Sequence, residues 1–387
     1  MSALGTGLVT IAAGGTLDLG TNTGASALSG SGLVTLNANT LTLNGDGNGS
    51  IEQESTYAGI ISGTGGLIIN NGNDNQILTG DNTFSGGITV AGGALTLGSN
   101  TAAGTGSITT TGSVIGYLNG VNSAAPIIIN SNTTQLQVNG ADAAEQSGVI
   151  SELGGPRPIE KIGTGTLTLS AANTYTGATT ITAGTLRASN GSALGNNSAV
   201  TVAGGATLDL TTGLAVGSLA GAGNVTLNAN SLGVGTDNTS TNFSGVISGT
   251  GGISKNGTGT QTFSGANTYS GNTVVNAGTL HVTGSIASST QIITNGGTLI
   301  AEAGALGATT DVGLNSGTFQ NNGNNTIQSL GARGRHQRRA QCRHVGHGRR
   351  RQRHHRRRHL WCGQPDQAGC GYPVSDRGQY LFGHHQR

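Results

Sequence analysis

The chain has 387 residues, of which 71 are glycine, 34% are hydrophobic, 3% are aromatic and 9% are charged. Ordinary globular domains contain about 7% glycine and about 25% charged residues, so this composition excludes an ordinary globular domain. The high glycine content alone does not indicate a disordered chain, because regularly spaced β-branched residues are frequent.

Charge divides the chain near residue 331. Up to Gly331, four basic residues stand against fourteen acidic residues, a net charge of 4 − 14 = −10. From Ala332 to Arg387, fourteen arginines stand against two aspartates, a net charge of 14 − 2 = +12. All three cysteines also lie in this second segment. The sequence therefore predicts a repetitive region, 1–331, and a basic tail, 332–387, that we expect to be irregular or disordered.

The first residues give no indication of a signal peptide, because Met1 is followed by a repeat and not by a basic start and a long apolar run. No stretch approaches the 18 apolar residues of a membrane-spanning helix. A cysteine-free repetitive region suits an exported protein that must stay unfolded in transit.

One phrase recurs three times along the repetitive region. A degenerate copy covers 72–95, and two close copies are KIGTGTLTLSAANTYTGATTITAGTL at 161–186 and KNGTGTQTFSGANTYSGNTVVNAGTL at 255–280. With their lead-in segments, the copies lie near 58–97, 147–187 and 244–283. Their marker residues Asn82, Asn173 and Asn267 are 173 − 82 = 91 and 267 − 173 = 94 residues apart. That spacing is too long for one coil, so each large repeat, counted from one copy to the next, must contain several coils.

Within the second copy, the local pattern alternates strands and turns. Thr166 to Leu169 alternates hydroxyl and aliphatic side chains, which in a strand sends leucine to one face and threonine to the other. A turn-rich run, NTYTG at 173–177, follows, and then come a β-branched run at 179–182 and another strand from Thr185. This alternation of strands and turns predicts a coil that winds back on itself.

A second sequence similarity relates two distant parts of the chain. The segment SALGTGLVTIAAGGTLDL at 2–19 resembles SALGNNSAVTVAGGATLDL at 192–210, and GLVTLNAN at 32–39 resembles GNVTLNAN at 223–230. Similarity at fixed periods is typical of stacked repeat proteins.

The fold expected from these patterns is all-β, a parallel β-helix (β-solenoid). Sustained helical spacing is absent, and dense Gly, Asn and Thr would weaken any helix. Glycine and asparagine suit the positive φ angles of corners, and asparagines such as Asn173 and Asn267 could form side-chain ladders. With about 20 residues per coil and about 4.8 Å between coils, the region would be a rod on the order of 75 Å long.

Catalytic patterns are weak, and we expect no enzyme, no cofactor and no metal site. Glu52 and Glu54 would share one face of a strand, but no basic or aromatic neighbours accompany them, and a solvated edge explains them better. His281 lacks a nucleophile at a recognisable spacing, so we expect an exposed strand residue. Tyr175 and Tyr269 could form a sugar-stacking platform, but packing over a corner is the favoured interpretation.

The basic tail allows three interpretations. Its arginines could bind nucleic acid, and Cys362 and Cys370 could suggest zinc, although their spacing does not match a zinc knuckle. The third interpretation explains more: back-translation of QYLFGHHQR at 379–387, advanced by one nucleotide, reads NTYSGTTN, the turn motif again. We therefore interpret 332–387 as an out-of-frame translation of a further repeat and expect no nucleic-acid partner. A gene sequence without such a shift near codon 331 would contradict this.

At these motifs the chain resembles the autotransporter-associated β-strand repeat, also called the passenger-associated transport repeat, of bacterial type V secretion. The resemblance implies a right-handed β-helix that is threaded through an outer-membrane translocator barrel and folds at the cell surface. It gives structural roles to the motif positions Gly163, Thr166, Leu167, Leu169, Asn173, Thr174, Tyr175, Gly177, Gly184, Leu186, Gly257, Asn267, Thr268, Tyr269, Gly271, Gly278 and Leu280.

The resemblance implies a structural passenger stalk that displays a distal adhesive part, for which host or surface glycans are conceivable partners. Neither an export signal nor a translocator is recognisable in this sequence, so we expect a fragment. The alternative is a β-helix that binds or cleaves polysaccharide, which glycan-binding or lyase assays would distinguish.

Overall fold

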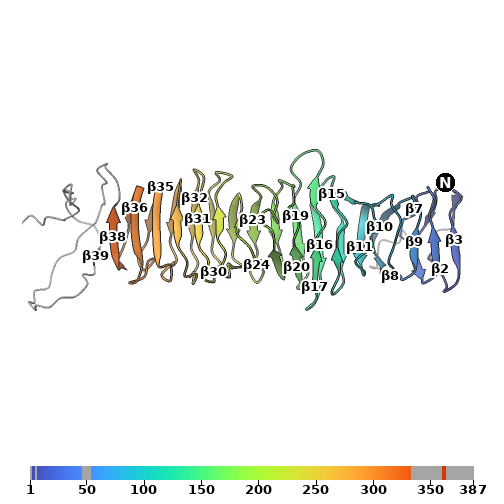
Figure 1. Ribbon diagram of the computed structural model, residues 1–387, viewed down its shortest axis with the longest axis horizontal. Helices are drawn as coiled ribbons and strands as arrows, with labels where there is room; N and C mark the ends of the chain where they lie inside the picture. The colour runs from blue at the N-terminus through green and yellow to red at the C-terminus, as the bar shows by residue number, and fades with distance from the viewer. Residues whose placement is uncertain (1, 5–6, 46–53, 333–359, 363–387) are drawn as a thin grey trace, which may run out of the picture.

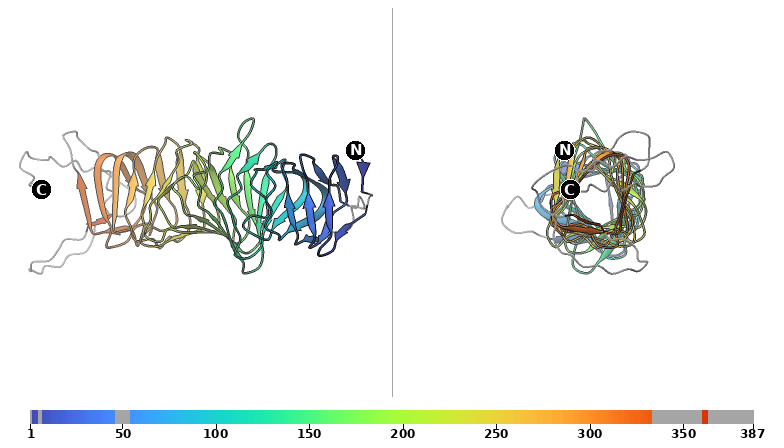
Figure 2. Two further views of the ribbon diagram at one scale, coloured as in Figure 1. Left: turned by 45° about the vertical axis from the view of Figure 1, so that its right-hand side comes forward. Right: turned by 90° about the vertical axis from the view of Figure 1, so that its left-hand side faces the viewer.

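The computed structural model describes residues 2–4, 7–45, 54–332 and 360–362. In these ranges all regular structure is β-strand, and the strands stack into one elongated rod with the N-terminus at one end (Figure 1). In the view along the rod axis, the stacked coils superimpose as a ring (Figure 2). The prediction of an all-β parallel solenoid is confirmed. The described residues include no helix that is long and apolar enough to cross a membrane.

Apart from one antiparallel pair near the C-terminal end, the described strands form ladders in which a strand pairs in parallel with the strand one coil further along the chain. Thr179, for example, pairs with Val200, 200 − 179 = 21 residues later. The first ladder contains β1 Ser2–Ala3, β4 Thr23–Ala25, β7 Leu41–Leu43, the first part of β10 Leu67–Leu78 and of β11 Ile88–Leu97, β12 Ile108–Thr110, β15 Ile127–Ile129 and β18 Ile150–Glu152.

The longest ladder follows a neighbouring side of the rod. It contains β2 Val9–Ile11, β5 Leu28–Gly30, β8 Glu54–Tyr57, the later parts of β10 and β11, β13 Val114–Tyr117, β16 Thr134–Val138, β19 Ile159–Ile162, β21 Thr179–Ile181, β23 Ala199–Val202, β26 Ser218–Gly221, β29 Thr241–Phe243, β32 Thr260–Phe263, β34 Thr279–Val282, and the later parts of β35 Gln291–Ala301 and β36 Asp311–Asn321.

Three shorter ladders complete the coils. One contains β3 Thr16–Asp18, β6 Leu33–Thr35 and β9 Ile60–Ser62. Another contains β14 Asn122–Ser123, β17 Ala143–Gln146, β20 Thr166–Leu169, β22 Thr185–Ala188, β24 Thr207–Leu210, β27 Asn224–Thr226 and β30 Val246–Ser248. The last contains β25 Leu214–Ala215, β28 Leu232–Val234, β31 Ile253–Lys255, β33 Thr273–Val275, the first parts of β35 and β36, and β38 Ser329–Ala332.

Of the tail, the structure describes Ala332 and β39 Leu360–Cys362, which pairs antiparallel with β37 Asn325–Ile327. The interpretation of the rest of 332–387, including its irregular character and its reading frame, lies outside the described residues.

A single apolar core runs inside the rod because alternate strand residues point inward. In β20 the leucines Leu167 and Leu169 are fully buried, whereas Thr166 and Thr168 are partly exposed. The aromatic residues Tyr57, Phe84 and Phe243 are fully buried in the same core. The alternation that the sequence predicts is confirmed, and each added coil extends the buried column.

Glycines occupy the corners where the backbone requires a positive φ angle. Gly163 and Gly257 have φ of 75° and 64°, and Gly184 and Gly278 have φ of 65° and 60°. Side chains rarely adopt this conformation. A Cβ at Gly184 would also lie 2.4 Å from the carbonyl oxygen of Gly165 in the preceding coil. Both the angle and the close approach of coils therefore demand glycine.

Neighbouring copies of the repeat are rotated about the rod axis. Ile88 and Thr179 are equivalent positions, 179 − 88 = 91 residues apart. Ile88 lies in the ladder of Ile108 and Ile127, whereas Thr179 lies in the ladder of β19 and β23. The distance between the first and second copies is thus not a whole number of coils. Equivalent side chains of these two copies therefore lie on different sides of the rod.

Candidate functional site

The most distinctive polar site is the asparagine of each NTY or NTF turn, which bridges three successive coils. The Oδ1 atom of Asn173 accepts a hydrogen bond from the backbone N–H of Ile150 at 2.7 Å, and its Nδ2 atom donates to the carbonyl oxygen of Ala193 at 2.6 Å. Asn82 makes the same contacts with Ile61 and Ala102, at 2.7 and 2.6 Å.

The third copy repeats the bridge. Asn267 accepts from the N–H of Ile247 at 2.9 Å and donates to the carbonyl oxygen of Ser285 at 3.1 Å. All three bridging asparagines are buried. Because a buried backbone group without a partner is costly, each bridge stabilises its corner by pairing a backbone N–H of the preceding coil and a carbonyl oxygen of the following coil.

The prediction of asparagine ladders was wrong for Asn173 and Asn267, because their amides bond to backbone groups of adjacent coils. A ladder exists elsewhere, on the exterior beside β31, β33, β35 and β36. There Asn276 donates to Asn256 at 2.9 Å, Asn295 to Asn276 at 3.1 Å, and Asn315 to Asn295 at 2.9 Å. The ladder forms where asparagines occupy the same position in consecutive coils.

Behind each bridge of the two close copies lies a buried chain of hydroxyl groups. The hydroxyl of Tyr175 lies 2.8 Å from Oγ1 of Thr179, which lies 3.0 Å from Oγ of Ser198, and Ser198 donates to the carbonyl oxygen of Gly177 at 2.7 Å. Burial raises the pKa of the Tyr175 hydroxyl, so the neutral phenol persists.

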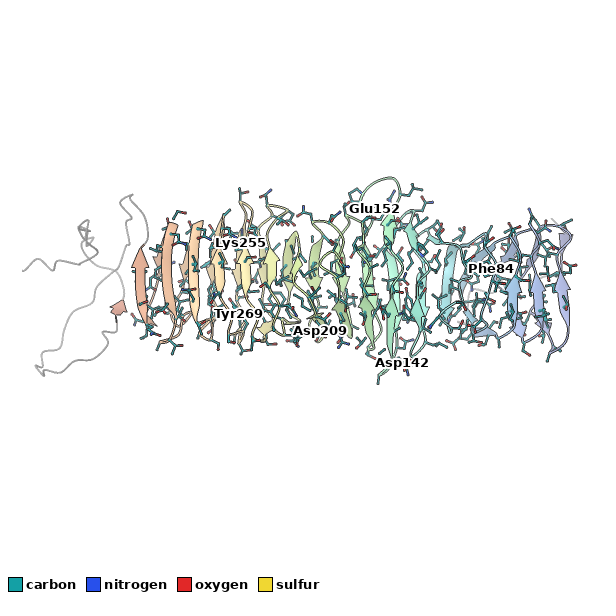
Figure 3. All side chains as sticks on the ribbon, in the orientation of Figure 1. Phe84, Asp142, Glu152, Asp209, Lys255 and Tyr269 are labelled. Atoms are coloured by element: carbon teal, nitrogen blue, oxygen red, sulfur yellow. The ribbon has the colours of Figure 1, made fainter. Side chains whose placement is uncertain are left out.

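Tyr269, Thr273 and Ser289 reproduce this hydroxyl chain in the third copy, with distances of 2.7 and 3.0 Å. Figure 3 marks Tyr269 within the coils. In the first copy the chain is replaced by carbon, since Phe84 stands for the tyrosine and Ile88 for the threonine, and both are buried. Fully buried rings cannot serve as a sugar-stacking platform, which removes that alternative for Tyr175 and Tyr269.

Two buried lysines, which sequence reasoning did not single out as site residues, cap the corners that open the close copies. Lys161 is 1% exposed, and its Nζ donates to the carbonyl oxygens of Ile162, Gly163 and Ala183 at 2.9, 2.8 and 3.3 Å. Burial lowers the pKa of Lys161 to about 8. Three acceptors match the three protons of an ammonium group.

Lys255, also marked in Figure 3, makes the same cap with the carbonyl oxygens of Asn256, Gly257 and Ala277. Burial lowers its pKa, and the charge of Asp237 acts in the opposite direction. In the first copy Ile69, paired with Val90 as Lys161 is with Ile181, takes the place of the lysine. The signal in the sequence was a lysine at the same place in two copies of a lysine-poor region.

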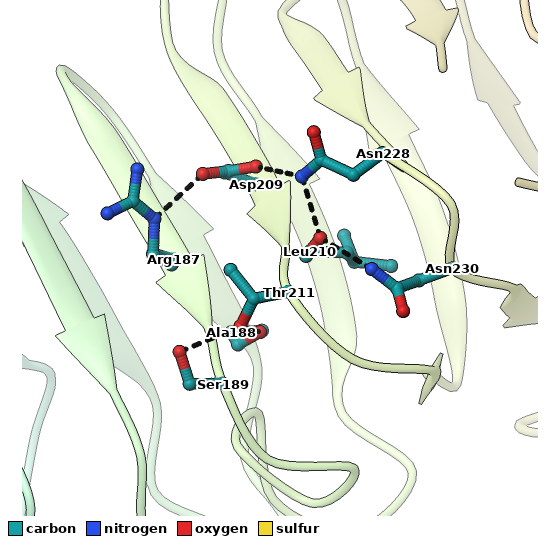
Figure 4. A network of polar contacts seen from close by, with 8 residues as sticks. All are labelled: Arg187, Ala188, Ser189, Asp209, Leu210, Thr211, Asn228 and Asn230. Atoms are coloured by element: carbon teal, nitrogen blue, oxygen red, sulfur yellow. Dashed lines mark hydrogen bonds and ion pairs between the residues drawn. The ribbon is translucent and has the colours of Figure 1, made fainter. Parts of the chain in front are cut away.

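The repeated motif TLDL…VTLNAN builds a further corner, drawn in Figure 4. Asn228 donates to the carboxylate of Asp209 at 2.9 Å and to the carbonyl oxygen of Leu210 at 2.8 Å, while Arg187 pairs with Asp209 at 2.8 Å. Asn37 makes the equivalent contacts with Asp18 and Leu19. The sequence echo between 2–39 and 192–230 thus has a common hydrogen-bonding basis.

The remaining motif residues lie in the core or against the backbone of the preceding coil. Leu186 and Leu280 are buried core residues, and the backbone N–H groups of Thr174 and Thr268 donate to the carbonyl oxygens of Ile150 and Ile247. A Cβ at Gly177 would lie 2.1 Å from the carbonyl oxygen of Arg157, and one at Gly271 would lie 2.2 Å from that of Gly251.

The acidic and histidine candidates do not converge. Glu54 lies exposed in β8, and Glu52 lies outside the described residues. His281 is partly exposed on β34, and its Nε2 lies 2.9 Å from Oε1 of Glu302, a partner that the sequence did not predict. Hydrogen bonds from Asn322 and then from His281 lower the pKa of Glu302. Across the described ranges, no group of three or more His, Cys, Asp or Glu side chains could hold a metal ion.

These features define a class of protein: a parallel β-solenoid whose corner motif returns at long intervals and joins three coils at each return. Comparison with known families agrees, because the Passenger-associated-transport-repeat model matches residues 68–97, 159–188 and 253–282. The chain therefore carries three copies of this repeat. The matched segments contain the bridging asparagines and the strands that follow them.

The chain is also similar to a named protein, the Adhesin BmaC autotransporter of Brucella suis biovar 1 (strain 1330). The two are 36% identical over 209 residues, which is 49% of this chain and 6% of the adhesin. The match thus spans a small part of the length of that relative. No solved structure matches the chain significantly.

Proposed function

We propose that this chain is a stalk segment of an autotransporter passenger, which holds an adhesive part of a longer protein away from the bacterial surface. The observation that carries the proposal is the parallel pairing that continues from β1 to β38 around one apolar core. The passenger-associated transport repeats and the similarity to an autotransporter adhesin support it. Such a continuous rod keeps its two ends a fixed distance apart, and this role needs no catalytic group.

The proposal includes a C-terminal translocator as the partner during secretion and the outer surface of the cell as the location. The bridging asparagines and buried lysines suit this route, because they become satisfied only when consecutive coils have formed. Each coil that folds outside would therefore add buried contacts that oppose its return through the membrane. The distal region, and not the described coils, would carry glycan recognition.

Display in a Gram-negative host tests the function. The chain would be placed between an export signal and an autotransporter translocator, and added protease would be used to detect it on intact cells. We expect surface exposure and a resistant core, together with no glycan-array binding and no lyase activity of the purified chain. Retention in the periplasm would contradict the stalk function, and specific glycan binding or cleavage would favour the polysaccharide alternative.

A further inference from the structure

Eight asparagines in the described part of the chain are followed directly by glycine. An asparagine in this position can react with its own backbone, because glycine has no Cβ to hinder the attack of its nitrogen on the amide carbon. The reaction requires the amide and the glycine N–H to be open to water and free of hydrogen bonds. The pairs begin at Asn44, Asn71, Asn119, Asn139, Asn190, Asn256, Asn295 and Asn322.

Burial or hydrogen bonds shield most of these pairs. Asn71 is only 3% exposed. The Oδ1 atom of Asn119 accepts a hydrogen bond from the backbone N–H of Ala143 at 3.0 Å, and the N–H of Gly120 donates to the carbonyl oxygen of Ala143 at 2.8 Å. Both reacting groups of the Asn119 pair are therefore engaged.

The exterior asparagine ladder shields two more pairs. Asn276 donates to Oδ1 of Asn256 at 2.9 Å and accepts from Nδ2 of Asn295 at 3.1 Å. Three further pairs are held by hydrogen bonds from Asn322 to Glu302, from the N–H of Ser192 to Asn190, and from the N–H of Gly45 to the carbonyl oxygen of Ser26, at 2.9, 2.9 and 3.0 Å.

The pair Asn139–Gly140 differs from the others. It begins the turn 139–142 between β16 and β17, in which the N–H of Asp142, labelled in Figure 3, donates to the carbonyl oxygen of Asn139 at 3.1 Å. Both residues of the pair are exposed. Within the described ranges, neither the Asn139 amide nor the Gly140 N–H has a hydrogen-bonding partner. Gly140 has a φ of 57°, and a Cβ there would meet nothing within 4 Å. The turn is thus open to water and has room to rearrange.

We propose that Asn139 is a site of spontaneous covalent modification. The nitrogen of Gly140 forms a bond to Cγ of Asn139, the bond from Cγ to Nδ2 breaks, and the proton of the Gly140 N–H leaves with Nδ2 as ammonia. Water then opens the cyclic imide at one of its two carbonyl groups. Opening at the side-chain carbonyl gives aspartate, and opening at the main-chain carbonyl gives isoaspartate. Each product carries a new negative charge.

Isoaspartate would disturb the corner that opens the second transport repeat, because it lengthens the backbone before Gly140 by a methylene group. The carbonyl oxygen of Gly140 accepts a hydrogen bond from Oγ1 of Thr164 at 3.0 Å, and that of Asp142 accepts from the N–H of Thr166 at 2.8 Å. A longer backbone displaces these acceptors relative to the next coil. The inference depends on this corner and is independent of the proposed display function.

The experiment incubates the full folded chain at mildly alkaline pH and follows each Asn-Gly pair by peptide mass spectrometry. Loss of ammonia reports the imide, and replacement of NH by O reports its hydrolysis. Methyl transfer by an isoaspartyl methyltransferase reports isoaspartate. Asn139 should react at least about tenfold faster than Asn119, because Asn119 must first break two hydrogen bonds. In concentrated urea the rates at the two sites should converge, since both are then unfolded Asn-Gly sequences.

Two variants complete the test. Asn139→Gln keeps an amide at this position and should abolish the modification there. Asn276→Ala removes the donor to Oδ1 of Asn256, so the rate at Asn256 should rise while the rate at Asn139 stays unchanged. The proposal is overturned if Asn139 in the folded chain reacts no faster than Asn119, or if urea leaves the difference between them intact. An unchanged rate at Asn256 in the Asn276→Ala variant would refute shielding by hydrogen bonds.

Discussion

The hydroxyl of Tyr175 lies 2.8 Å from Oγ1 of Thr179, and the corresponding pair in the first repeat is Phe84 and Ile88. The polar pair and the carbon pair occupy equivalent buried corners in two copies of the repeat. The chain therefore contains its own comparison between a hydrogen-bonded and an apolar version of one contact.

Tyr175→Phe should lower the local free energy of unfolding by about 1 kcal/mol, because it removes a buried hydrogen bond while Thr179 keeps Ser198 as a partner. Adding Thr179→Ile reproduces the pair of the first repeat. Because Ser198 keeps its contact with the Gly177 carbonyl, we expect the double variant to recover part of the loss. Hydrogen exchange of β21 measures both. A double variant that loses as much stability as Tyr175→Phe alone, or more, would contradict this prediction.

Asn173→Ala should be more damaging, because it leaves the Ile150 N–H and the Ala193 carbonyl unpaired. The cost is about 1–3 kcal/mol for each buried group. Thermal unfolding followed by circular dichroism, together with protease cleavage near the NTYTG turn, measures the effect. The matched control is Asn196→Ala, since Asn196 is exposed, and it should leave the melting temperature nearly unchanged. Equal effects of the two variants would refute the bridging role.

Gly177→Ala should destabilise the second repeat by about 1–3 kcal/mol, because its Cβ would overlap the backbone of Arg157. Gly204 supplies the control, since a Cβ there meets nothing within 4 Å. Urea titrations of Gly177→Ala and Gly204→Ala are the measurement. If both midpoints stay at the value of the unmodified chain, the close approach of coils does not limit this position.

Because Lys161 is buried, we expect the stability of the fold to depend on pH. The sign follows from the pKa of Lys161, which is about 8 in the folded chain and 10.5 ordinarily. Between about pH 8 and pH 10 the unfolded chain binds more protons than the folded chain, so stability should rise with pH. Above about pH 10, the buried tyrosines Tyr175 and Tyr269 retain protons that an unfolded chain loses, so stability should fall.

Melting temperatures at pH 7.5, 8.5 and 9.5 check this prediction. Lys161→Met should flatten the rise, and Lys161→Met combined with Lys255→Met should flatten it further, because the pKa of Lys255 is lowered too. The prediction fails if the double variant keeps the full slope of the unmodified chain.

The sequence by itself determined the local geometry of each coil. Alternation in Thr166–Leu169 determined which side chains enter the core, and glycine at 163 and 184 determined where the backbone turns with positive φ. Local rules suffice there because the period of a strand and the steric limits of φ depend on a few adjacent residues. The spacing of Asn82, Asn173 and Asn267 also predicted several coils per repeat.

Only the tertiary structure decided which polar groups meet. The lysine at 161 would be expected in solvent, but closure of the coil brings the carbonyls of Ile162, Gly163 and Ala183 around its ammonium group. Asn173 was expected to stack on another asparagine, yet it contacts Ile150 and Ala193, 23 and 20 residues away. Such contacts depend on the residue count of every intervening coil, which sets the register between layers and which no local pattern in the sequence contains.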